Sequence, residues 1–148
     1  MFPRVAHLEL EMSTESKKPS LYDRLGGIYA IAAVVDTFID RIMVDPVLNA
    51  NPLVDEAHHR VPKAGFKYLV TEMVGQVTGG PQRYTGKTMF ESHKHLNISP
   101  AEWQVFAEHF KAVLDHYKVP EAEQQELFAI VGSTRSDIVV ERPAAKAG

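Results

Sequence analysis

The sequence predicts an all-α domain, and three features point to this fold class. Apolar residues recur three or four positions apart over most of the chain and almost never alternate as they do in strands. Pairs of glycines, and prolines, fall between the periodic segments, where they end helices. A length of 148 residues is that of one domain with a buried core.

The first periodic segments lie between Ser20 and Pro46. Ser20 is expected to cap a short helix, which Gly26-Gly27 ends because paired glycines favour a turn. A longer helix follows and stops at Asp45-Pro46, since the residue before proline avoids the helical region. The apolar face of this second helix comprises Ile31, Val34, Val35, Phe38 and Ile42, with Ile39 at its margin.

Two irregular stretches border the next helix. Residues 47–61 show no sustained period and are expected to form a long loop with one turn. A helix is predicted from about Pro62 to Thr78, where Gly79-Gly80-Pro81 ends it. A second irregular stretch then leads into a short helix that carries Met89 and His93. The apolar face of the helix 62–78 comprises Phe66, Leu69, Val70, Met73, Val74 and Val77.

A capping box marks the start of the next helix. Ser99 is the N-cap, Pro100 takes the first helical position and Glu102 follows the cap by three residues. Val119-Pro120 separates this helix from a last one. The apolar residues of the two helices are Trp103, Phe106, Phe110, Val113, Leu114 and Tyr117, then Leu127, Phe128, Ile130 and Val131.

The composition excludes several classes of function. The chain has no cysteine, which excludes disulfides, thiolate metal sites, iron–sulfur clusters and a catalytic thiol. A net charge of -3 gives no electrostatic case for nucleic acid. No apolar run approaches the roughly 20 residues that cross a bilayer, and the first residues lack the features of a secretory signal. We therefore expect a cytoplasmic protein with neither a membrane nor a nucleic-acid partner.

The two ends of the chain differ in composition from its centre. Residues 1–19 include a polar stretch with paired lysines, and residues 141–148 are rich in Ala, Pro and Lys. Both are expected to be disordered, because such segments bury little apolar surface. The predicted folded domain therefore spans residues 20–140.

Among the seven histidines, His93 is the strongest candidate for an interior ligand. His93 and His95 point about 200° apart on a helix, so only one of them faces the interior. Met89 and Leu96 line the same face as His93, which leaves His95 in solvent. His109 and His116 lie about 10 Å apart along a helix axis, too far to chelate one ion. From the residues alone, a buried macrocycle and plain packing of aromatic side chains both stay open.

Three motifs resemble the truncated haemoglobins, most closely those of group I. They are S-L-Y-D-R-L-G-G at Ser20 to Gly27, V-V-D-T-F-I-D-R at Val34 to Arg41, and G-G-P-Q-R-Y-T-G-K-T-M-F-E-S-H at Gly79 to His93. The similarity runs in order from about Ser20 to Ile138, and the third motif is the most specific because several unusual positions precede the histidine at fixed spacing.

The resemblance implies a two-over-two helical sandwich that encloses haem b, with His93 as the proximal iron ligand. It also implies a pocket lining, carried over position by position, and places Lys87 where the family often has an arginine near a propionate. The implied cofactor-binding residues are Phe38, Ile39, Phe66, Leu69, Val70, Met73, Tyr84, Lys87, Met89, Ile98, Trp103, Phe106 and Val131.

The distal side departs from the family pattern. Where the family often has a tyrosine that donates to bound oxygen, this chain has Ile39, and the positions that usually carry polar residues on the next helix hold Phe66, Leu69 and Val70. We therefore expect weak or short-lived oxygen binding, with nitric oxide and carbon monoxide binding retained. Two alternatives stay open: Tyr68 enters the pocket if the register shifts by one residue, or a loop histidine, His58 or His59, makes the iron six-coordinate.

The predicted function is reversible binding of diatomic gases at a histidine-ligated haem iron. The alternatives are nitric oxide dioxygenase or peroxidase-like redox activity, and a regulatory module that keeps the globin fold without haem. The expected partners are the gases and a reductase, and the expected state is a monomer or weak dimer.

Overall fold

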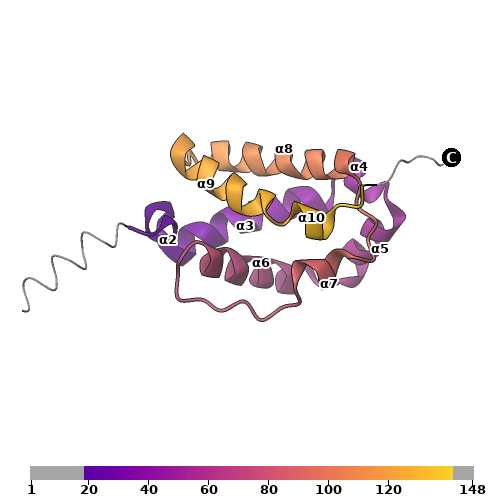
Figure 1. The fold of residues 1–148 in the computed structure, drawn as a ribbon, viewed down its shortest axis with the longest axis horizontal. Helices are drawn as coiled ribbons and strands as arrows, with labels where there is room; N and C mark the ends of the chain where they lie inside the picture. The colour runs from indigo at the N-terminus through magenta and orange to yellow at the C-terminus, as the bar shows by residue number, and fades with distance from the viewer. Residues whose placement is uncertain (1–18, 142–148) are drawn as a thin grey trace, which may run out of the picture.

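The computed structural model describes residues 19–141, and this part of the chain is all-α, as predicted (Figure 1). The predicted disordered ends lie outside the described residues, apart from Pro19 and Glu141. The helices of the described part are α2 (Leu21–Leu25), α3 (Gly27–Met43), α4 (Pro46–Asn49), α5 (Pro52–Arg60), α6 (Lys63–Val77), α7 (Met89–His93), α8 (Pro100–His116), α9 (Glu121–Gly132) and α10 (Arg135–Ile138).

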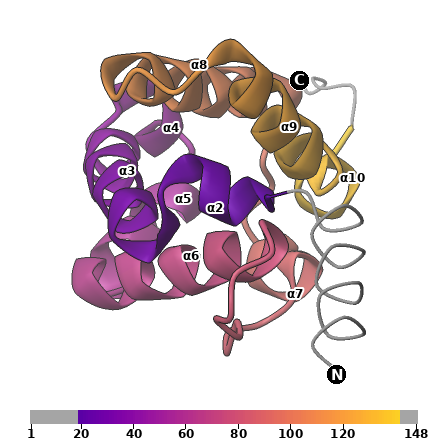
Figure 2. The same ribbon diagram turned by 90° about the vertical axis from the view of Figure 1, so that its left-hand side faces the viewer.

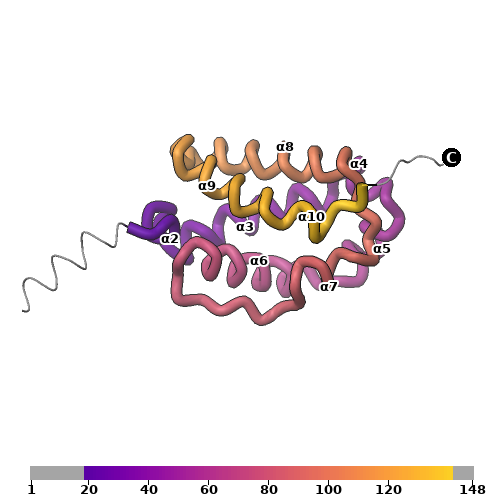
Figure 3. The backbone as a smooth tube through the Cα atoms, in the orientation of Figure 1, coloured from indigo at the N-terminus to yellow at the C-terminus, as the bar shows by residue number. Residues whose placement is uncertain are grey.

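The helices form two antiparallel pairs. The chain runs along α3 and returns along α6. The segment through α7 then crosses to the other end, so that α8 runs in the same direction as α6 before the chain reverses into α9 (Figure 3). Helix α3 packs on both α6 and α8, while α7 lies against α10 (Figure 2). The arrangement is the two-over-two sandwich that the resemblance implies, with α3 covered by both α6 and α8.

Local capping signals place the helix starts where the sequence predicts them. The Ser20 hydroxyl accepts a hydrogen bond from the Asp23 amide at 3.0 Å, and Gly26, at φ 102°, ends α2 in the left-handed region. At the start of α8, the side chains and amides of Ser99 and Glu102 form the reciprocal capping box.

The predicted loop at residues 47–61 is wrong, because the segment forms α4 and α5. Each helix begins with a capping residue followed by proline: Asp45 accepts from the Leu48 amide, and Asn51 accepts from the amides of Leu53 and Val54. Each helix buries only one side chain, so no apolar period marks it in the sequence. Neither α10 nor the β-bridge between Ile98 and Val139 was predicted.

The largest core cluster is centred on α3. Phe38 and Ile39 belong to it, and Ile39 is only 1% exposed, so its predicted place at the margin of the apolar face is wrong. The face is wider than one stripe because α6 and α8 both cover α3. Among residues 19–141, no helix has the length and apolar character needed to span a membrane.

Candidate functional site

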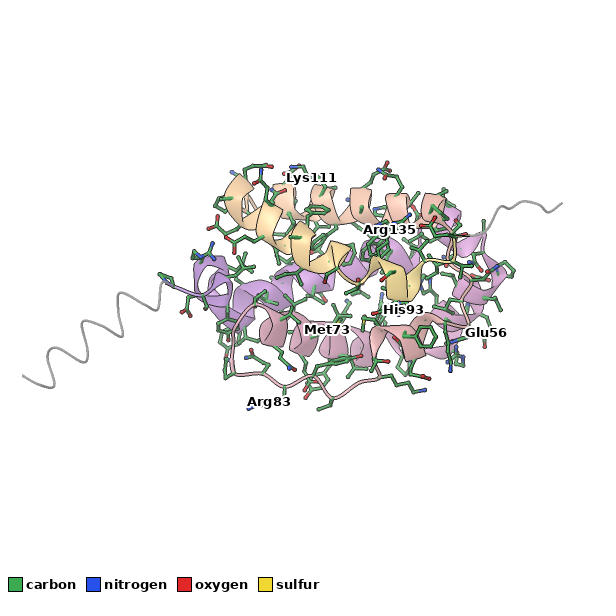
Figure 4. All side chains as sticks on the ribbon, in the orientation of Figure 1. Glu56, Met73, Arg83, His93, Lys111 and Arg135 are labelled. Carbon is green, nitrogen blue, oxygen red and sulfur yellow. The ribbon has the colours of Figure 1, made fainter. Side chains whose placement is uncertain are left out.

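His93 lies at the end of α7, between that helix and α10 (Figure 4). Its Nδ1 lies 2.8 Å from the carbonyl oxygen of Met89, one helical turn earlier. A carbonyl only accepts, so Nδ1 carries the hydrogen. Burial lowers the pKa of His93, with a smaller contribution from the charge of His95 and an opposing one from the Met89 bond. The ring is therefore neutral at pH 7, with an electron pair on Nε2.

Short-range hydrogen bonds build α7 around this histidine. Thr88 caps the helix by accepting from the Glu91 amide at 3.1 Å, and the Ser92 hydroxyl donates to the Thr88 carbonyl at 2.9 Å. His95 follows the helix and is exposed, as predicted. His93, the last residue of α7, is thus half-buried, while His95, two residues beyond the end of the helix, is exposed.

Helix α6 holds the loop that precedes α7. The Gln76 side chain accepts from the Tyr84 amide at 2.6 Å, and one carboxylate oxygen of Glu72 accepts from the Thr85 amide at 3.1 Å and from its hydroxyl at 2.7 Å. These roles of Glu72 and Gln76 were not predicted, since nothing local in the sequence links the two residues to the loop. Gly86 belongs to the same arrangement, because a Cβ there would lie 2.4 Å from the Tyr84 hydroxyl.

The structure gathers several of the predicted lining residues in one place. Phe38 and Ile39 are buried in the α3 cluster, and half-buried Phe66, Val70, Ile98 and Phe106 pack against that cluster. Four further predicted residues, Leu69, Met73, Met89 and Val131, are half-buried side chains of the surrounding helices.

Aromatic contacts and the loop place the rest of the predicted set. The Phe106 ring lies 5.2 Å from those of both Phe38 and Trp103, centroid to centroid. Tyr84 is half-buried and its hydroxyl donates to the Lys87 carbonyl at 2.7 Å, while the Lys87 residue is exposed. The Lys87 ammonium is therefore exposed to solvent, where it can pair with an anionic group without the cost of burying a charge.

The three polar residues considered for the distal side have partners elsewhere. Tyr68 is 60% exposed, and a hydrogen bond to Glu72 raises the pKa of its phenol. His58 Nδ1 lies 2.6 Å from the Asn49 side-chain oxygen in α4. His59 Nδ1 lies 2.8 Å from the Asp55 carbonyl, and its side chain is 79% exposed.

The donor set around His93 suits a haem iron. A neutral imidazole nitrogen is the ligand that haem iron takes from a globin, and a backbone carbonyl on the other ring nitrogen fixes its tautomer. Phe66, Val70 and Phe106, which pack against the α3 cluster, offer apolar, incompletely buried surface, as a porphyrin face requires.

Comparison with known proteins gives the family. The sequence model of the family described as bacterial-like globin matches residues 20–140. The chain belongs to this family. A group 1 truncated hemoglobin of Tetrahymena pyriformis is 26% identical over 124 residues, which are 84% of this chain and 98% of that protein. The group 1 truncated hemoglobin GlbN of Nostoc commune is 31% identical over 94 residues, which are 61% of this chain and 71% of that protein.

Solved structures of truncated haemoglobins share the fold of this globin. The crystal structure of the Tetrahymena pyriformis protein in its Fe(III) form superposes with a TM-score of 0.71 at 26% identity, covering 81% of this globin and 97% of that chain. The family and its relatives identify the chain as a haem-binding globin of the group I truncated type.

Proposed function

We propose that this globin holds haem b through Nε2 of His93 and reversibly binds oxygen, nitric oxide and carbon monoxide. The observation that carries the proposal is the hydrogen bond from His93 Nδ1 to the Met89 carbonyl, since it leaves Nε2 as the ligating nitrogen. Haem, when bound, supplies the iron at which a diatomic gas binds.

On the proximal side, the chain orients the imidazole and tunes its basicity. A histidine that donates from Nδ1 to a carbonyl is a stronger ligand than one whose Nδ1 has no acceptor. Ser92 adds a second polar atom, with its hydroxyl oxygen 2.9 Å from the same nitrogen. Lys87 is proposed to pair with a propionate at the solvent edge.

The proposed distal wall is apolar. Ile39, Phe66 and Val70 belong to or pack against one cluster, and their side chains carry no hydrogen-bond donor. Oxygen gains most from a donor, because it takes negative charge from the iron, and such a bond is worth about 1.5–3 kcal/mol. We expect oxygen affinity about tenfold to a hundredfold below that of a donor-bearing globin. Nitric oxide and carbon monoxide depend less on the donor.

The arrangement favours gas binding over dioxygenase or peroxidase-like chemistry. Peroxide cleavage benefits from a polar acid–base group within hydrogen-bond reach of the substrate. The candidates for that role, Tyr68, His58 and His59, have Glu72, Asn49 and Asp55 as their partners. The reductase partner, the monomeric or weakly dimeric state and the cytoplasmic location stay predictions from the sequence.

A haem titration tests the proposal. Haemin is added to the purified chain, and the intense Soret absorption is followed for the wild type, His93→Gly and the control His95→Gly. We expect stoichiometric binding by the wild type and the control, weak binding by His93→Gly, and recovery when free imidazole is added. A wild type that takes up no haemin, or a His93→Gly variant with an unchanged spectrum, would contradict the proposal.

Gas binding is tested on the reduced, loaded protein. Stopped-flow mixing with each of the three gases gives association and dissociation rates. We expect rapid oxygen release alongside stable complexes with carbon monoxide and nitric oxide. Slow oxygen release would show that a donor reaches the ligand.

A further inference from the structure

A single buried side chain, that of Asn51, joins two segments that are far apart in the sequence. Asn51 is 8% exposed and lies between α4 and α5. Its side-chain oxygen caps α5, accepting from the amides of Leu53 at 3.0 Å and Val54 at 3.4 Å. A serine or aspartate would cap the helix equally well, so capping alone does not explain an amide here.

The amide nitrogen of Asn51 reaches the loop between α7 and α8. It donates to the carbonyl oxygens of Leu96 at 2.9 Å and Asn97 at 3.2 Å, and to a carboxylate oxygen of Glu102 at 3.0 Å. These three acceptors surround one NH₂ group, which only an amide supplies at this position. The side-chain oxygen of Asn51 therefore caps α5, while its nitrogen joins α5 to the loop after α7.

The loop that Asn51 holds begins directly after His93. The Leu96 amide donates to the His93 carbonyl at 2.8 Å, so the residue that accepts from Asn51 is itself bonded to the histidine backbone. Further along, the Ile98 carbonyl accepts from the Val140 amide at 2.7 Å. The exit of α7 is thus fixed by α5 at one point and by the C-terminal segment at another.

We propose that Asn51 is a positioning residue for His93: its NH₂ group fixes the two carbonyls after α7 and so sets where the imidazole presents Nε2. The inference rests on the proposed role of His93 as the haem ligand. Helix α7 has only five residues and no fully buried side chain, so its own packing holds it weakly. Anchoring of its exit then decides the orientation of the histidine.

The test replaces the donor while keeping the cap. Asn51→Asp retains an acceptor for α5 but turns a negative charge toward two carbonyl oxygens and the Glu102 carboxylate. The matched control is Asn49→Asp, two residues earlier, whose amide donates to the Met43 carbonyl at 2.9 Å and does not touch the loop. Asn51→Ser, which also caps a helix but adds no charge, serves if Asn51→Asp fails to fold.

Three measurements separate positioning from general destabilisation. They are amide hydrogen exchange at residues 94–99, the iron–histidine stretching band of the ferrous protein in resonance Raman spectra, and the rate of haem transfer to an excess of another apoglobin. For Asn51→Asp and Asn51→Ser we expect exchange and haem loss to be about tenfold faster and the band to shift or broaden. Asn49→Asp is expected to keep the wild-type band and the wild-type exchange in this loop.

The outcomes distinguish the two proposals. A wild type that takes up no haem overturns the role of His93, and with it this inference. A wild type that takes up haem while the Asn51 variants keep its band and loop exchange overturns the role of Asn51 alone. The same spectral change in Asn49→Asp would also overturn it, because the effect would then reflect lost stability.

Discussion

Nδ1 of His93 donates to the carbonyl oxygen of Met89 over 2.8 Å within the single turn of α7. This bond gives the ring one orientation and one tautomer, and it leaves Nε2 for a metal. The expected chemistry of the site follows from that relationship together with the apolar side chains around it.

The first prediction concerns the stability of the haem-free protein at acidic pH. Burial is the main cause that holds the pKa of His93 below its usual value in the folded chain. The unfolded chain therefore takes up this proton first, at about pH 6.5, so the free energy of unfolding of the haem-free protein falls as the pH drops below that value. Urea unfolding at several pH values, compared with His93→Gln, measures the effect. Equal pH dependence in both proteins would contradict it.

The second prediction restores a distal donor. Ile39 is 1% exposed in the α3 cluster, at the position where the family often carries a tyrosine. Ile39→Tyr is expected to slow oxygen dissociation about tenfold to a hundredfold, because the phenol donates to the ligand. The control Ile39→Phe introduces a ring of nearly the same size as tyrosine but without the hydroxyl donor. It should leave oxygen dissociation fast. Stopped-flow rates decide, and equal rates in the two variants would show that position 39 does not face the gas.

The third prediction is that removing the Tyr68 hydroxyl leaves oxygen dissociation nearly unchanged. Tyr68 is 60% exposed and hydrogen-bonded to Glu72, so we expect its phenol to take no part in gas binding. Tyr68→Phe should change oxygen dissociation by less than about twofold, well under the effect of losing a donor. A large acceleration would restore the alternative register in which Tyr68 enters the pocket.

The fourth prediction concerns stability at the junction of α3, α4 and α8. The Asp45 carboxylate accepts from the Leu48 amide at 2.9 Å and from His109 Nε2 at 2.8 Å. Its side chain is 13% exposed, and Asp45→Ala should lower the free energy of unfolding by about 1–3 kcal/mol. Asp36→Ala removes an exposed carboxylate paired with Lys67 and should cost less than about 1 kcal/mol. Urea unfolding of both variants measures the difference.

The contribution of Asp45 to the free energy of unfolding depends on pH. Burial raises the pKa of its carboxyl, but the hydrogen bonds from His109 and the Leu48 amide outweigh burial, and the net pKa is lowered. The contribution is therefore present above about pH 4 and is lost as the pH falls further. The wild type and Asp45→Ala should converge in stability on acidification, and a constant gap between them would contradict the assignment.

Features that depend only on neighbours along the chain are predictable from the sequence. Ser20 and Ser99 cap helices because their partners lie three residues away, and apolar periodicity places α3, α6 and α8. The bond from His93 Nδ1 to the Met89 carbonyl is equally local, because it spans one turn of α7. The family motif around His93 was recognisable for the same reason, since its residues are contiguous.

The tertiary structure decided what depends on residues distant in sequence. Ile39 is fully buried because α6 and α8 both cover α3, and α4 and α5 show no apolar period because each buries only one side chain. Asn51 reaches Leu96, 45 positions later, and no local pattern encodes that contact. Propensity and capping act within one turn of a helix, whereas the anchoring of a ligand and the polarity of a pocket arise only when separate segments pack together.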